Sequence, residues 1–222
     1  MEQQNLPDIP ETLINGPPWE RRDELGFFLA FVETIRYLLW RPGQLFSVMH
    51  RGTGLGGALV FAVALQVFTT VWRFAIADAM GDPIPILPPE ILDLVDAPED
   101  LTRWVIMLFP LWLIAFHFLK AGAFHLALRL RGVEDRRFAL MFRVLAYGAG
   151  GASILLLLPM VGGLLSLVYS VYLLYLGIRT VYGLAGGQFL GLAVIASLLL
   201  LGFFIAILIG LSLLEVLVLL IL

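Results

Sequence analysis

Hydrophobic residues in this chain gather in long runs separated by short polar segments, a pattern typical of a protein that crosses a membrane several times. A helix needs about 20 predominantly apolar residues to span the hydrocarbon core of a bilayer. Five runs come close to that length or exceed it, and the third is the shortest. They are Gly54–Ile76, Val105–Leu126, Val144–Val161, Leu164–Tyr182 and Phe189 to about Ile209. The sequence therefore predicts an all-α membrane protein with five transmembrane helices.

The apolar run that begins at Phe189 continues to Leu222 without a polar turn. Its 34 residues would form a helix about 51 Å long at 1.5 Å per residue, well beyond the roughly 30 Å of a hydrocarbon core. We therefore expect this helix to tilt, to project outward or to break near Gly202 or Gly210. The absence of a polar turn argues against a sixth crossing.

An amphipathic segment, Glu24–Trp40, precedes the five runs. Its polar or small positions recur every three or four residues, as on one side of a helix: Arg22, Gly26, Ala30, Glu33 and Arg36. The segment is too charged to span a bilayer and too apolar to stay in water, which favours an interfacial helix over the alternative, a cytosolic core helix. Glu33 and Arg36, at i and i+3, can pair and should face water. Lipid or the bundle should contact Phe27, Phe28 and Phe31.

Three regions follow from this pattern. Residues 1–23 are polar and proline-rich and lack the apolar run of a signal peptide, so we expect a cytosolic tail that is either flexible or ordered on contact. Residues 24–41 form the interfacial helix, which ends before Pro42 because proline disfavours helical geometry at the preceding residue. Residues 52–222 form the five-helix transmembrane domain.

Composition excludes several classes of protein. The chain has 222 residues, of which 60% are hydrophobic and 14% charged, whereas soluble domains are roughly 45–50% apolar and about 25% charged. The net charge of −3 shows no basic excess that would indicate a nucleic-acid partner. The absence of cysteine excludes disulfides, thiolate metal sites and a cysteine nucleophile. The expected partners are the lipid bilayer and a membrane protein or a second copy of the chain.

The placement of lysine and arginine predicts the orientation, because these residues concentrate in cytoplasmic loops. With the N-terminus in the cytoplasm and the C-terminus outside, 12 of the 14 basic residues lie on the cytoplasmic side. The loop between spans two and three and its flanks contribute Lys120, Arg129, Arg131, Arg136, Arg137 and Arg143. Arg73 and Arg103 fall on the other side, together with the acidic loop Ala77–Asp100. We expect a multi-pass protein of the inner (cytoplasmic) membrane.

Several short motifs occur in a characteristic order between about Pro18 and Leu201. They are Pro18-Trp19-Glu20, then Pro42 with Phe46 and Met49, His125 with Leu130-Arg131-Gly132, Phe138 with Arg143-Val144-Leu145-Ala146-Tyr147, Pro159-Met160-Val161-Gly162, and Leu176-Gly177-Ile178-Arg179. In order and spacing they resemble the YIP (Ypt-interacting protein) membrane family, and its bacterial branch most closely.

The resemblance implies a five-span helical bundle with a cytosolic N-terminus, in agreement with the charge distribution. Eukaryotic members of the family are associated with Rab GTPases and vesicle traffic, but this sequence lacks their Asp-Leu-x-Gly-Pro motif, so GTPase binding does not carry over. The zinc ribbon of some bacterial relatives is excluded because the chain has no cysteine. The family offers no catalytic residue to transfer.

Polar residues on the second span form the main candidate site. His117, Lys120 and His125 spread over an arc of about 140° at 100° per residue, and a charge near mid-bilayer usually faces the bundle or a wet cavity. The functional interpretation is a cavity that handles protons or anions. The structural interpretation is that His117 stays neutral and bonded to a helix backbone, while the ammonium of Lys120 extends toward headgroups on the Arg129 side.

The remaining candidates are weaker. Arg73, near the far end of the first span, can pair with Asp78 or Asp82, or can contact a substrate. Neither a metal-ligand spacing nor a nucleophile with a placed base occurs, so we expect no catalytic residue, no metal and no cofactor.

The sequence favours a non-enzymatic scaffold or adaptor that works through the interfacial helix and the basic loop, with Glu33, Arg36, Arg129, Arg131, Arg136 and Arg137 as its interaction surface. The alternative is a small transporter, channel or lipid-moving protein with a cavity around Arg73, His117 and Lys120.

Overall fold

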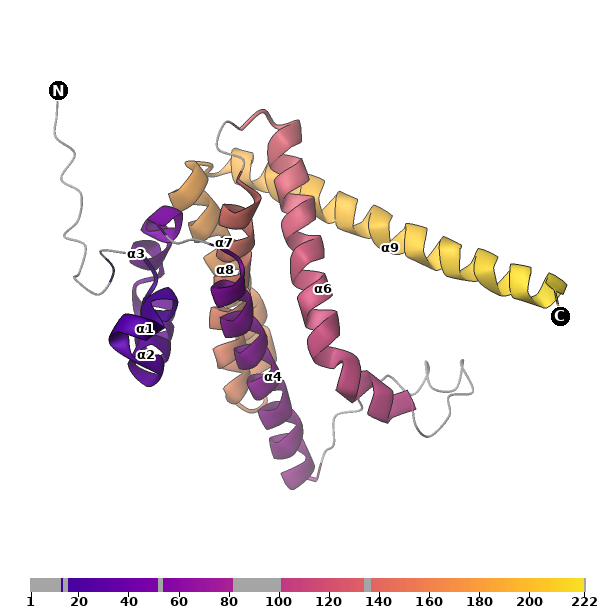
Figure 1. Ribbon diagram of the computed structural model, residues 1–222, viewed down its shortest axis with the longest axis horizontal. Coiled ribbons are helices and arrows are strands. Elements are labelled where there is room, and N and C mark those ends of the chain that lie inside the picture. The colour runs from indigo at the N-terminus through magenta and orange to yellow at the C-terminus, as the bar shows by residue number, and fades with distance from the viewer. Residues whose placement is uncertain (1–12, 14–15, 52–53, 82–100, 134–136, 222) are drawn as a thin grey trace.

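The computed structural model describes residues 13, 16–51, 54–81, 101–133 and 137–221. Within these residues five helices are long and apolar enough to cross a membrane, which confirms the predicted all-α membrane class. They are α4 (Gly56–Ala79), α6 (Leu101–Leu130), α7 (Phe138–Ser153) with its 3₁₀ extension η4 (Ile154–Leu157), α8 (Gly162–Tyr182) and α9 (Gly187–Ile221). Figure 1 shows α4, α7 and α8 side by side, with α6 beside them.

Helix α7 is the centre of the bundle. Thirteen of its sixteen residues are buried, and it packs against α4, α6 and α8. Glycine permits this close packing, since a Cβ at Gly150 would lie 3.2 Å from the Cα of Ala62, and one at Gly177 only 2.6 Å from Cγ1 of Val144. Small residues at helix interfaces let backbones approach within a membrane.

The predicted start of the third span is wrong by six residues. We expected the span to begin at Val144 after a separate amphipathic stretch, but α7 begins at Phe138 and is continuous from there. From Leu140 onward every residue of the stretch is buried, including its one charged side chain, Arg143. This arginine therefore lies inside a buried helix, with 1% of its surface exposed, rather than at the edge of the basic loop.

The N-terminal part of the described chain is a cluster of short helices packed beside α4, α7 and α8. They are η2 (Pro18–Arg21), α1 (Arg22–Leu25), α2 (Phe27–Trp40), α3 (Pro42–Ser47) and η3 (Met49–Arg51). The predicted amphipathic helix is thus broken at Gly26, whose φ of +85° is readily adopted by glycine. Its end at Trp40, two residues before Pro42, is as predicted.

The face that α2 turns to the bundle differs from the predicted pattern. Ala30, which the periodicity placed on the polar side, is fully buried, together with Thr34 and Leu38. A small residue is needed there because the helix lies against the bundle. On α8, the Tyr169 hydroxyl donates to the Leu38 carbonyl at 2.6 Å and thereby satisfies the C-terminal end of α2.

Helices α6 and α9 diverge from the central three. The N-terminal part of α6, which contains Pro110, bends away from α4 in Figure 1; proline removes a helix hydrogen bond and commonly causes such kinks. Helix α9 runs unbroken through Gly202 and Gly210 and leaves the bundle at a large angle (Figure 1). Of the three outcomes expected for the long apolar run, a break at Gly202 or Gly210 does not occur.

Candidate functional site

Trp19 anchors the N-terminal segment inside the bundle. Its side chain is 3% exposed, and its indole Nε1 donates to the Gly57 carbonyl at the start of α4 at 2.7 Å. Its backbone N–H donates to Oγ1 of Thr34 on α2 at 2.8 Å. The indole ring packs edge-on against Phe31, at 5.9 Å between ring centroids, and lies beside Phe61 of α4. Trp19 thus joins the short helix Pro18–Arg21 to both α2 and α4.

Glu20, the next residue, forms a buried ion pair with Arg143 of α7. The guanidinium Nε lies 2.9 Å from one carboxylate oxygen, and Nη2 lies 2.6 Å from the other. The hydroxyl of Tyr147, one turn further along α7, donates to the same carboxylate at 3.1 Å. Arg143 also donates through Nη1 to the Met49 carbonyl. Two-point pairing of this kind is among the strongest polar contacts in proteins.

The environment of Glu20 opposes its ionisation in one way and supports it in another. Burial raises the pKa of Glu20, while the positive charge and hydrogen bonds of Arg143 act to lower it. The side chains of Arg143 and Glu20 are 2% and 12% exposed, so neither charge has bulk water as an alternative partner. Losing either member would leave the other charge buried without compensation.

The Glu20–Arg143–Tyr147 cluster was missed as a site from the sequence. Its three residues are all in motifs that carried the family resemblance, but nothing in the spacing indicated that the first motif touches the fourth. A signal did exist: Arg143 stands beside an apolar run that begins at Val144. An arginine in a membrane helix generally needs a partner, but nothing in the sequence indicated that Glu20 supplies it.

On α6, His117 is a structural contact between two helices. Its Nε2 lies 3.0 Å from Oε1 of Gln66 on α4, and because an amide oxygen only accepts, the histidine donates. Its residue is 2% exposed. The expected bond of His117 to a helix backbone differs from the contact found, because the partner of Nε2 is the side chain of Gln66, a residue that the sequence did not single out.

Lys120 does not extend in the expected direction. Its Nζ lies over the ring of Phe116, 4.7 Å from the centroid, which is one turn back toward the start of α6 and away from Arg129. Side chains of a helix lean toward its N-terminus, so the helix geometry opposes the predicted direction. His125, further along α6, packs edge-on against Phe138 at 5.7 Å.

Arg73 lies in a different place from the α6 residues. It lines a cavity of about 240 Å³ between the end of α4 and the turn that joins η4 to α8, with Trp72, Met80, Pro159 and Gly163 among its walls. Neither His117 nor Lys120 is among its described lining residues. The predicted ion pair with Asp78 is not formed, and Asp82, the other predicted partner, lies outside the described residues. The structure therefore does not bring Arg73, His117 and Lys120 into one site.

The predicted interaction surface has two parts. On α2, Arg36 pairs with Glu33 at 3.1 Å, as the spacing predicted, and a second cavity of about 200 Å³ lies beside Arg36, Tyr37, Trp40 and Arg41. At the ends of α6 and α7, Arg129, Arg131 and Arg137 are exposed. Arg136 lies outside the described residues.

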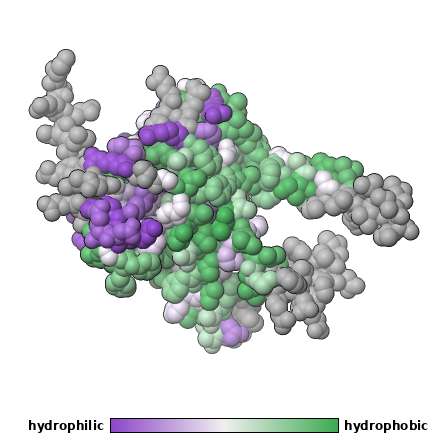
Figure 2. Space-filling model, in the orientation of Figure 1, coloured by the Kyte–Doolittle hydropathy of each residue, from purple (hydrophilic) through white to green (hydrophobic). Residues whose placement is uncertain are grey.

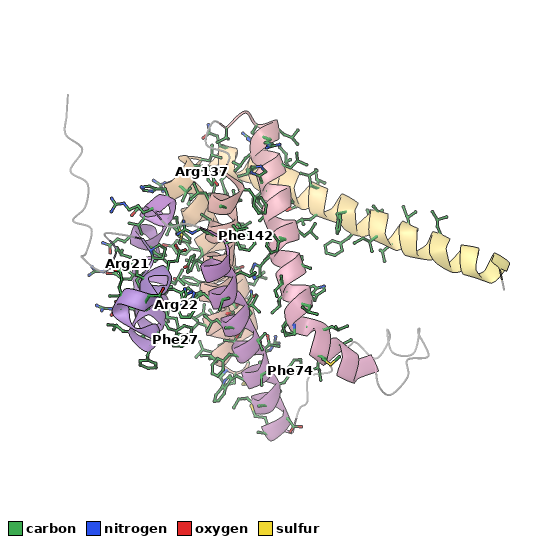
Figure 3. The ribbon with its side chains drawn as sticks, in the orientation of Figure 1. Arg21, Arg22, Phe27, Phe74, Arg137 and Phe142 are labelled. Carbon is green, nitrogen blue, oxygen red and sulfur yellow. The ribbon has the colours of Figure 1, made fainter. Side chains whose placement is uncertain are left out.

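Hydrophilic side chains cluster over the N-terminal helices, which include α2. In the view of Figure 2 they gather over the N-terminal helices, while the face of the bundle is largely hydrophobic. Figure 3 shows Arg21 and Arg22 in this region, together with Phe27, whose ring packs edge-on against Trp19 at 5.2 Å between ring centroids. Phe27 and Phe28 are 67% and 78% exposed. The N-terminal helices thus present a mixed surface of charge and large apolar side chains.

Among the described residues, no group of three or more histidine or carboxylate side chains is arranged to hold a metal ion. The polar cluster of Glu20, Arg143 and Tyr147 instead joins the N-terminal segment to the transmembrane helices.

Comparison with known proteins gives the family. The Yip1 domain matches residues 36–209, from the middle of α2 through the first part of α9. The chain belongs to the Yip1 domain family. The match covers α4, α6, α7, α8 and the first part of α9. Trp19 and Glu20, which dock on these helices, lie before the first matched residue. No curated protein and no solved structure matches the chain.

Proposed function

We propose that this Yip1-domain protein is a non-enzymatic membrane-organising or adaptor scaffold, related most closely to bacterial members of the family. Its place is the inner membrane, with the N-terminus in the cytoplasm and the C-terminus outside. The observation that carries the proposal is the packing around His117, whose Nε2 is bonded to Gln66 and which lines neither of the two cavities described above. A transport pathway would require water or substrate at such a residue.

The working surface of the scaffold is the outer side of α2 together with the basic ends of α6 and α7. Phe28 and Leu29 are 78% and 51% exposed, and Arg36 lies further along the same helix. Apolar side chains next to arginine suit the boundary between headgroups and acyl chains, where an interfacial helix is stabilised by both. A partner membrane protein or a second copy of the chain would meet the scaffold at this boundary.

The docked segment supports this role because it holds α2 in one position. Trp19 bonds to Thr34 of α2, Glu20 bonds to Arg143 of α7, and Tyr169 of α8 bonds to the end of α2. An adaptor surface gains affinity when it is ordered before the partner arrives, since less conformational entropy is then lost on binding.

Two measurements on the full-length protein test the proposal. The first is proton and anion flux in reconstituted vesicles, which should equal that of empty vesicles. The second is a quantitative pull-down from native membranes, comparing the parent with a Phe28→Ser, Leu29→Ser variant. A matched control carries Leu167→Ser and Val168→Ser on α8, where the two residues are similarly exposed, at 63% and 61%.

The scaffold proposal expects partners that are lost with the α2 variant and kept with the α8 control. A flux above that of empty vesicles that His117→Phe abolishes, with folding intact, would instead establish the transporter.

A further inference from the structure

We propose that the Arg73 cavity, at the end of the bundle opposite Arg129 and Arg137, binds the phosphodiester headgroup of an anionic glycerophospholipid. The site is independent of the proposed scaffold surface, because it is formed by the end of α4 and the turn before α8 rather than by the N-terminal helices.

The cavity is large enough for a headgroup. Its volume of about 240 Å³ is several times the share of about 30 Å³ that one water molecule occupies in the liquid. One wall is held in place because the Trp72 indole donates to the Leu157 carbonyl at 3.3 Å. The space therefore persists between two tethered elements and accommodates a phosphate with the first atoms of its substituents.

The charge of the cavity selects an anion. Arg73 is the one charged residue among the described lining residues, and the others are apolar or glycine. Within the described part of the chain, no ion pair satisfies its guanidinium. A basic group at the bilayer boundary attracts anionic headgroups, and phosphate oxygens match the donors of a guanidinium in a two-point geometry. The described lining offers no carboxylate for the ammonium of a zwitterionic headgroup, so a headgroup with a single net negative charge fits best.

The depth of Arg73 favours a lipid over a dissolved anion. Arg73 follows Gly56, the first residue of α4, by 17 positions, or about 26 Å along the helix axis. The hydrocarbon core is roughly 30 Å thick, so the guanidinium reaches the level of the phosphates at the far boundary. Met160, which lines the cavity, is 94% exposed, and Leu164, which follows the lining residue Gly163, is 69% exposed. These side chains would contact the acyl chains of a lipid whose phosphate enters the cavity.

The test uses native mass spectrometry of the full-length protein in neutral detergent. Three probes are added separately: a short-chain phosphatidylglycerol, the matching phosphatidylcholine, and inorganic phosphate. We expect bound phosphatidylglycerol, at least tenfold weaker binding of phosphatidylcholine, and no bound phosphate at the same concentration. Arg73→Gln should weaken phosphatidylglycerol binding at least tenfold. Arg179→Gln, which removes an exposed arginine at the other end of α8, should leave it unchanged.

A second pair of variants keeps the test decisive if Arg73→Gln does not fold. A Cβ at Gly163 would lie 3.9 Å from Nη2 of Arg73, an ordinary contact, so Gly163→Ala should bind as the parent does. Gly163→Leu fills the cavity while keeping the charge and should abolish binding. Unchanged binding by Arg73→Gln or Gly163→Leu overturns the site. Equal binding of phosphatidylcholine overturns selection by charge, and equal binding of inorganic phosphate overturns a lipid as the ligand.

Discussion

Glu20 and Arg143 lie 123 positions apart in the chain and form a two-point ion pair between the N-terminal segment and the central transmembrane helix. The hydroxyl of Tyr147 adds a third hydrogen bond to the same carboxylate. The position of the segment before α1 is therefore determined by a helix that follows two other transmembrane helices in the sequence.

Removing one member of this pair should destabilise the docked segment. Because the remaining charge stays buried, we expect Glu20→Gln or Arg143→Met to cost about 3–5 kcal/mol, measured as thermal stability of the full-length protein in detergent. The double variant should cost less than the sum of the two single variants. Glu24→Gln is the control, since Glu24 is 59% exposed in its pair with Arg21 and such pairs contribute at most about 1 kcal/mol. Additive losses in the double variant would contradict the proposed coupling.

Gly177→Ala should destabilise the contact between α8 and α7. The new Cβ would lie 2.6 Å from Cγ1 of Val144, and overpacking of this kind costs about 1–3 kcal/mol. Adding Val144→Ala should recover part of the loss, because it removes the methyl group that clashes. Gly202→Ala is the control, since nothing lies within 4 Å of the added atom. A Gly177→Ala variant as stable as the parent would show that the two helices can separate without cost.

The bond between Gln66 and His117 gives a third prediction. Gln66→Leu leaves the buried Nε2–H of His117 without its acceptor, so we expect a loss of about 1–3 kcal/mol in stability. The double variant Gln66→Leu, His117→Phe removes both polar groups and should be more stable than Gln66→Leu alone. The measurement is thermal unfolding, in the same detergent, of Gln66→Leu, His117→Phe and the double variant. A double variant less stable than either single one would mean that His117 has a second role.

Lys120→Met should be tolerated. The substitution loses the contact with the Phe116 ring, worth about 0.5–2 kcal/mol, but it also removes a charge that is costly within a membrane helix and keeps the apolar stem. The measurement compares Lys120→Met with His117→Phe for folding and for cellular function. If both variants fold normally and both abolish function, the scaffold proposal fails and the polar arc of α6 is a working site.

Accessibility of introduced cysteines tests the proposed orientation. The chain has no cysteine of its own, so each label reports one position. In sealed cells, an impermeant thiol reagent should modify a cysteine at Met80, exposed at the end of α4, and should not modify one at Arg129, exposed near the end of α6. Labelling of the second position, with the first protected, would reverse the proposed orientation.

Hydropathy alone predicted the five long helices, because a bilayer requires about 20 apolar residues in a row whatever the neighbours are. It also predicted the end of α2, since Pro42 acts locally. It did not predict the break at Gly26, where the backbone has a φ of +85°. The start of α7 was missed because the charge of Arg143 was taken to mark the end of the apolar run. In the structure Glu20 pairs with this arginine, so the helix can bury it.

The candidate sites show the same division between local and distant causes. The pair of Glu33 and Arg36 followed from helical spacing. The partners of His117 and Arg143 did not, because Gln66 and Glu20 lie on other elements, and one sequence carries no record of which elements meet. For Lys120, the direction of side chains along a helix would have favoured Phe116 over Arg129.

The distance in sequence between Glu20 and Arg143 also orders the events of biosynthesis. A ribosome adds roughly 5–20 residues per second, so the 123 positions that separate the two residues represent about 6–25 s of translation. During that time α4 and α6 are made and can insert, while Trp19 and Glu20 have neither the α7 guanidinium nor a complete pocket. The first residues to emerge are thus among the last to reach their native position, and a nascent chain interrupted before α7 would carry an N-terminal segment with nowhere to dock.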